Sequence, residues 1–81
     1  MTTQEKIYSE TSLIVYPSSR EDSDKLNQYF LNSMFYAVFD SVGCCYVLPT
    51  SEDTIDELES TLDEEFGYHK INASFEANII Q

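Results

Sequence analysis

The chain has 81 residues, 42% of them hydrophobic and including six Tyr and five Phe, which is enough for one small domain with a folded core. Fifteen acids against four bases give a net charge of −11, which repels nucleic acid, anionic membranes and acidic metabolites alike. No apolar run approaches the roughly 20 residues that cross a bilayer, and the N-terminus lacks the layout of a signal peptide. The sequence therefore predicts a cytoplasmic protein whose natural partner is basic.

The first elements along the chain are predicted to be a strand and a helix. Residues 1–6 are expected to form a loose N-terminus, whereas the β-branched and aromatic run 11–17 predicts a strand that Pro17 ends. Ser18 and Glu21 then have the spacing of a capping box, which predicts that a helix begins there. The apolar residues that follow share one helical face: Leu26, Tyr29 and Phe30.

Residues 34–49 allow two interpretations. Continued helical spacing would extend the helix to about residue 41, and it is carried by Met34, Ala37 and Val38. The aromatic and β-branched composition, with Gly43 in a short connection, instead favours a β-hairpin whose strands are covered on most of both faces. We favour the hairpin over the longer helix.

The second helix is predicted to cover the acidic stretch 51–66. Thr50 and Asp53 offer another capping box, and Gly67 stands where a C-terminal cap is expected. Its buried face is predicted from one apolar stripe: Ile55, Leu58, Leu62 and Phe66. The last segment alternates like a half-buried strand at Ile71, Ala73, Phe75 and Ala77.

The predicted element order is β-α-β-β-α-β. This order indicates an α+β fold of the ferredoxin-like kind, with a four-stranded antiparallel sheet and two helices on one face, built as a single domain over residues 1–81. Such a fold carries many unrelated functions, so the order of elements leaves the function open.

Few residues point to catalysis or to a bound cofactor. The one histidine, His69, is expected at the start of the last strand, and no nucleophile motif accompanies it. The acidic stretch has helical spacing and lacks the central glycine of a calcium-binding loop. Cys44 and Cys45 are adjacent and are expected to be buried, reduced thiols. We therefore expect no enzyme activity, no metal and no cofactor.

The acidic stretch is the strongest functional signal. Between Lys25 and Lys70 there is no basic residue, whereas nine acids lie there. A helix selected for stability alone would intersperse lysines, because Glu–Lys pairs four residues apart stabilise it and like charges at that spacing destabilise it. The predicted partner-binding residues are the eight acids of this stretch: Glu52, Asp53, Asp56, Glu57, Glu59, Asp63, Glu64 and Glu65.

In size, charge and segregation of charge, the chain resembles small phage-encoded inhibitors that mimic DNA and block DNA-processing or defence proteins. The resemblance rests on no shared motif and carries over no site residue. It implies an acidic inhibitor that occupies a basic nucleic-acid-binding surface. The alternative is a non-enzymatic interaction or assembly domain, whose acids mainly give solubility and whose partner meets an apolar or sheet-edge surface.

Overall fold

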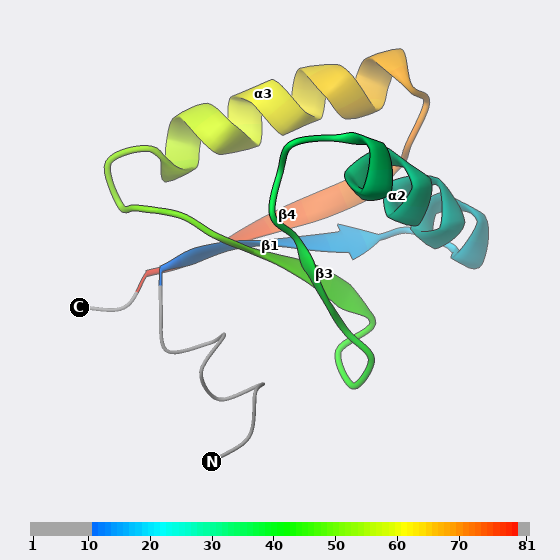
Figure 1. The fold of residues 1–81 in the computed structure, drawn as a ribbon, viewed down its shortest axis with the longest axis horizontal. Helices are drawn as coiled ribbons and strands as arrows, with labels where there is room; N and C mark the ends of the chain where they lie inside the picture. The colour runs from blue at the N-terminus through cyan, green and yellow to red at the C-terminus, as the bar shows by residue number, and fades with distance from the viewer. Residues whose placement is uncertain (1–10, 80–81) are drawn as a thin grey trace.

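The computed structural model describes residues 11–79 and has the predicted order of elements (Figure 1). The strands are β1 (Ser12–Pro17), β2 (Val38–Asp40), β3 (Cys45–Pro49) and β4 (Ala73–Asn78). The helices are α2 (Arg20–Asn32) and α3 (Ile55–Tyr68). The N-terminus that was predicted to be loose, residues 1–6, lies outside the described residues.

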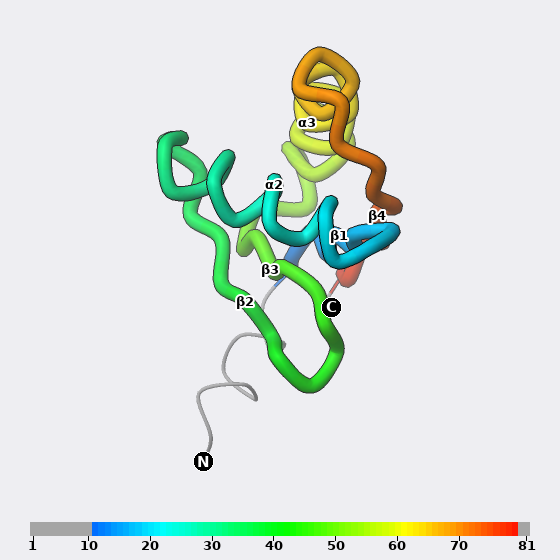
Figure 2. The backbone as a smooth tube through the Cα atoms, turned by 90° about the vertical axis from the view of Figure 1, so that its right-hand side faces the viewer, coloured from blue at the N-terminus to red at the C-terminus, as the bar shows by residue number. Residues whose placement is uncertain are grey.

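The four strands form one antiparallel sheet in the order β2-β3-β1-β4, so β1 and β3 are central. Both helices lie on the same face of this sheet, and Figure 2, which looks nearly along α3, shows α2 running across the view. Helix α3 contacts β1 and β4, which leaves β2 at the opposite edge of the sheet. The α+β, ferredoxin-like prediction is confirmed.

The main core lies between the helices and the sheet. Its buried sheet residues are Leu13, Val15, Tyr46 and Leu48. Its buried helix residues are Leu26 and Phe30 from α2 and Ile55, Leu62 and Phe66 from α3. The apolar stripe predicted for α3 is therefore confirmed, with Leu58 packed at its margin. On the opposite face of the sheet, Ile14, Cys45 and Val47 form a smaller buried cluster.

Helix α2 begins one residue later than predicted. Ser19, not Ser18, is the N-cap, because its hydroxyl oxygen accepts the backbone N–H of Asp22 at 3.1 Å. The Asp22 carboxylate accepts the Ser19 hydroxyl at 2.8 Å and the backbone N–H of Asn72 at 3.1 Å. The Asn72 hydrogen bond is the main reason that the pKa of Asp22 is lowered, and the Ser19 hydroxyl adds to it. This contact ties the start of α2 to the approach to β4.

The hairpin interpretation of residues 34–49 is confirmed, and the longer helix is wrong. Helix α2 stops because the Ser33 hydroxyl donates to the carbonyl of Phe30 at 3.2 Å and then accepts the N–H of Phe35 at 3.2 Å. The strands are less covered than predicted. Strand β3 is buried from Cys45 to Leu48, but β2 has only three residues and Phe39 is 50% exposed.

The turn between β2 and β3 is built around the Asp40 carboxylate. Its Oδ1 accepts the N–H of Val42 at 3.0 Å. A Cβ on Gly43 would lie 3.0 Å from Asp40 Oδ2 and 3.2 Å from Cys45 Sγ, so a larger residue would crowd the turn. Cys44 has a left-handed φ of 52° and is exposed, which corrects the prediction that both thiols are buried. Cys45 is buried as expected, and Cys44 and Cys45 form no disulfide.

Helix α3 also differs from prediction at its two ends. It begins at Ile55 after Thr54, whose side chain makes no capping hydrogen bond, so the predicted Thr50–Asp53 capping box does not form. At the other end, Gly67 lies inside the helix, and the left-handed residue is Lys70, with a φ of 58°.

The end of α3 is a Schellman motif. The N–H of Ile71 donates to the carbonyl of Phe66 at 2.8 Å, and that of Lys70 donates to the carbonyl of Gly67 at 3.3 Å. Ile71 and Phe66 are both buried in the main core, which provides the apolar contact typical of this motif. Burial of Ile71 therefore decides where the helix ends.

We predict that Gly67→Ala stabilises the protein by about 0.5–1 kcal/mol, because an interior helical glycine is replaced by a better helix former. A Cβ at this position would meet no atom within 4 Å. Thermal or urea unfolding measures the change. A loss of stability would mean that residue 67, and not Lys70, adopts the left-handed conformation that ends the helix.

Candidate functional site

All eight predicted partner-binding acids lie at the surface of the protein. Six are exposed: Glu52, Asp53, Asp56, Glu57, Asp63 and Glu64. Glu59 and Glu65 are half-buried, because each flanks one side of the apolar stripe of α3. At about 100° per residue, the acids from Asp56 onward therefore spread over the whole arc of the helix that does not face the core.

Two of the eight acids are not in the helix. Glu52 and Asp53 lie in the turn before Ile55 and not in the helix predicted over 51–66, so they are not on a helical face with Asp56 and Glu57. Negative charge beside the N-terminus of a helix is stabilising, because the backbone N–H groups there carry partial positive charge. These two acids therefore have a structural role that requires no partner.

The six acids within α3 give the helix a mean charge density along its axis close to that of one nucleic-acid strand. Fourteen residues at 1.5 Å each give the helix a length of about 21 Å, which is about one carboxylate per 3.5 Å. One strand of duplex DNA carries a phosphate every ~3.4 Å along the axis. The six residues are Asp56, Glu57, Glu59, Asp63, Glu64 and Glu65.

The acids at the C-terminal end of α3 oppose the stability of the helix. Asp63, Glu64 and Glu65 lie in its last two turns, where exposed carbonyls carry partial negative charge, and the last turn contains no basic residue. Glu59 and Asp63 also form a like-charged pair four residues apart. Local helix energetics therefore do not explain this part of the acidic surface.

The basic residues do not neutralise α3. Among the described residues, the single ion pair joins Lys25 Nζ to Glu21 within α2 at 3.7 Å. Lys25 Nζ also donates to the carbonyl of Lys70 at 3.2 Å, which brings two of the bases together beyond the end of α3. Arg20 starts α2 in the same region. The acidic arc of α3 thus faces solvent without an ion pair inside the described part of the chain.

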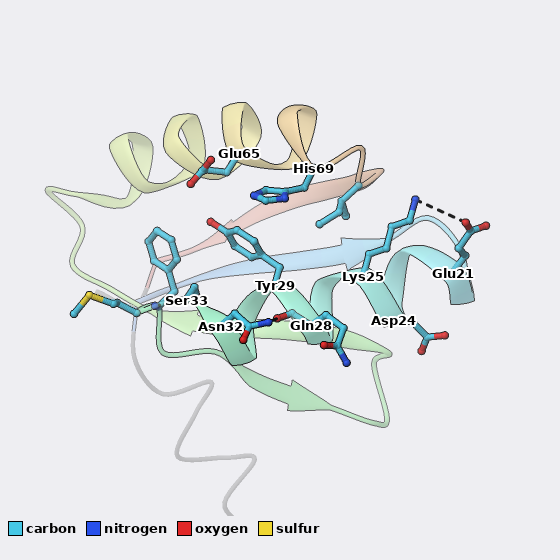
Figure 3. Close-up of a pocket in the computed structure, with 12 residues that line it drawn as sticks. Glu21, Asp24, Lys25, Gln28, Tyr29, Asn32, Ser33, Glu65 and His69 are labelled. Carbon is cyan, nitrogen blue, oxygen red and sulfur yellow. Dashed lines mark hydrogen bonds and ion pairs between the residues drawn. The ribbon is translucent and has the colours of Figure 1, made fainter.

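An open groove of about 830 Å³ runs between α2 and the C-terminal end of α3 (Figure 3). Tyr29 lies at its centre, with its ring 5.3 Å from that of His69 and 6.3 Å from that of Phe35. Carboxylates stand at its margins on both helices: Glu21, Asp24 and Glu65.

The Tyr29 hydroxyl is directed toward Glu65 (Figure 3). Burial is the main reason that the pKa of Tyr29 is raised, and the carboxylate of Glu65 raises it further. His69 borders this groove and is itself exposed, at the C-cap of α3 and not at the start of β4. The groove could not be predicted from the sequence, because residues 21–35 and 65–71, which form its walls, are distant in the chain.

The described residues contain no group of three or more His, Cys, Asp or Glu side chains placed to hold a metal ion. Within the same part of the chain, neither helix is long and apolar enough to cross a membrane.

A second surface feature is apolar. Among residues 11–79, seven large hydrophobic residues are at least 40% exposed, and five of these lie between residues 31 and 42. We call these five the β2 edge patch: Leu31, Met34, Tyr36, Phe39 and Val42. Tyr46 of β3 is in the core, whereas Tyr36 and Phe39 belong to this patch.

Comparison with protein-family models, curated proteins and solved structures finds no match to the chain.

We predict that Asp63→Lys raises the free energy of unfolding by about 0.5–1.5 kcal/mol, by placing a positive charge near the helix C-terminus and four residues after Glu59. Asp56→Lys is the matched control, since it makes the same charge change in the first turn, where it should destabilise. Urea unfolding of both variants measures the effect. Equal stabilisation by both variants would show that net charge, and not position along α3, determines the change in the free energy of unfolding.

Proposed function

We propose that this protein is a small acidic inhibitor whose helix α3 takes the place of a nucleic-acid strand on a basic surface of another protein. One observation carries the proposal: the carboxylates of α3 are spread around its exposed arc, which they share with Ser60, Thr61 and Tyr68, and they form no ion pair among the described residues. They extend to Asp63, Glu64 and Glu65, where they cost helix stability. The negative charge of these carboxylates would attract a target groove that is lined by Lys and Arg.

The geometry explains how such binding would work. A helix fixes the backbone positions of its acids before binding, so no backbone segment has to become ordered when the target docks. The mean density of about one carboxylate per 3.5 Å of helix axis would give a basic groove a negative charge comparable to that of one nucleic-acid strand. The target would be a nucleic-acid-processing enzyme or a defence complex, and the chain itself would contact no nucleic acid. A phage origin and action in the host cytoplasm belong to the same proposal.

The alternative function is an assembly domain whose acids serve solubility. The specific observation that favours it is the β2 edge patch, which is uncharged and exposed. The two functions use different surfaces, so substitutions can separate them.

The target is to be captured from a bacterial lysate at low salt, eluted by salt and identified by mass spectrometry. Inhibition by mimicry predicts that the eluted proteins have basic nucleic-acid-binding grooves. It also predicts that affinity falls steeply as salt rises from about 50 to about 500 mM, because screening weakens charge–charge attraction. Binding that barely changes over this range would contradict the proposal.

We predict that reversing Asp56 and Asp63 together to Lys weakens target binding by roughly 100-fold or more at low salt, since like charges would then face each other. Their opposite effects on α3 should leave the fold stable. The matched control reverses Glu21 and Asp24, two exposed acids of α2. Each pair changes the net charge from −11 to −7, because two reversals add two units each. Equal losses in both variants would contradict a binding role specific to α3.

A further inference from the structure

The β2 edge patch is concentrated on one segment of the chain. Its members extend from the last turn of α2 through the connection to β2 and into the β2–β3 turn. Met34 is fully exposed, Val42 is 81% exposed, and Tyr36 and Leu31 are each more than 70% exposed. These five exposed side chains follow one another along the segment that leads into and out of β2, so this segment is the most apolar exposed part of the described chain.

The patch is also the uncharged part of a highly charged protein. From Leu26 to Ser51 the only residue charged at neutral pH is Asp40. Asp40 is 9% exposed, and its carboxylate accepts the N–H of Val42 inside the turn. A basic partner would find no opposite charge here. Two copies of this chain, each with a charge of −11, could meet here with the fewest opposed carboxylates.

The adjacent strand has the form of an open sheet edge. Strand β2 is the outermost strand on one side of the described sheet and has neither lysine nor proline, two residues that commonly block edge-to-edge pairing. The other outer strand, β4, carries the exposed Glu76 and lies under the acidic helix α3. Of the two outer strands in the described sheet, β2 therefore combines strand geometry, apolar side chains and absence of exposed charge.

We propose that the β2 edge patch binds a second copy of this chain, with the two β2 strands antiparallel about a two-fold axis. A two-fold axis presents the same surface from both partners, and edge strands related in this way can extend one sheet into the other. Large aromatic side chains each bury roughly 150–250 Å². Five exposed side chains therefore offer several hundred Å², approaching the ~800 Å² per partner of standard interfaces.

Dimer formation through β2 would leave the acidic helices open. Helix α3 contacts β1 and β4, so in a dimer the two copies of α3 lie over the outer parts of the joined sheet. The dimer therefore does not depend on the proposed inhibitory function and does not block it. If both hold, each dimer presents two separate acidic helices.

Sedimentation velocity over about 1–500 µM protein tests the dimer through mass action. We expect the sedimenting mass to rise from the monomer value of 9.3 kDa to twice that value with increasing concentration. Tyr36→Glu should raise the dissociation constant roughly ten-fold or more, because it places a charge in each half of the interface. Tyr68→Glu is the matched control, since Tyr68 is similarly exposed, at 80% against 72%, but lies at the end of α3.

Salt dependence separates this proposal from the proposed function. Higher salt should strengthen the dimer, because it screens repulsion between two acidic chains, whereas it should weaken binding to a basic target. Circular dichroism checks that both variants stay folded. A wild-type monomer at every concentration and salt level, or equal dissociation of both folded variants, would overturn the dimer. Neither result would affect the test of α3 as a target-binding helix.

Discussion

Helix α3 is held against the sheet by one narrow apolar stripe. Phe66 in this stripe contacts both β4 and α2. Its ring stacks on Phe75 of β4 at a centroid distance of 5.6 Å and meets the edge of Tyr29 of α2 at 5.4 Å. Its carbonyl accepts the N–H of Ile71, which ends the helix and starts the path to β4. Because this stripe fixes the rotation of α3, it also decides which residues face water. The acidic arc is the surface that remains after the stripe is buried.

The same packing divides the molecule into a charged side and an uncharged edge. The carboxylates of α3 lie over β1 and β4, whereas the exposed apolar residues follow β2 at the opposite edge of the sheet. Electrostatic attraction would act at the first surface and burial of apolar area at the second. Salt should therefore affect the two proposed interactions in opposite directions, which lets one protein be tested for both.

Periodicity was sufficient to predict the element order and the buried stripe of α3, because each depends on side-chain spacing within one segment. The helix ends could not be predicted in the same way. Ser18 and Ser19 are equally good caps locally, and the choice follows from Asp22, whose carboxylate is fixed by the distant N–H of Asn72. Gly67 resembles a cap, but burial of Ile71 moves the left-handed residue to Lys70.

The acidic residues of the candidate site could also be read from the sequence, but their roles could not be separated. Only the position of Ile55 as the first helical residue shows that Glu52 and Asp53 stabilise the start of α3, whereas Asp63 and its neighbours oppose its end.

The most direct test of the central claim is a competition measurement on the captured target with labelled duplex DNA. Mimicry predicts that this protein displaces the DNA completely and that bound DNA excludes the protein in return. A stable ternary complex of target, DNA and this protein would contradict it.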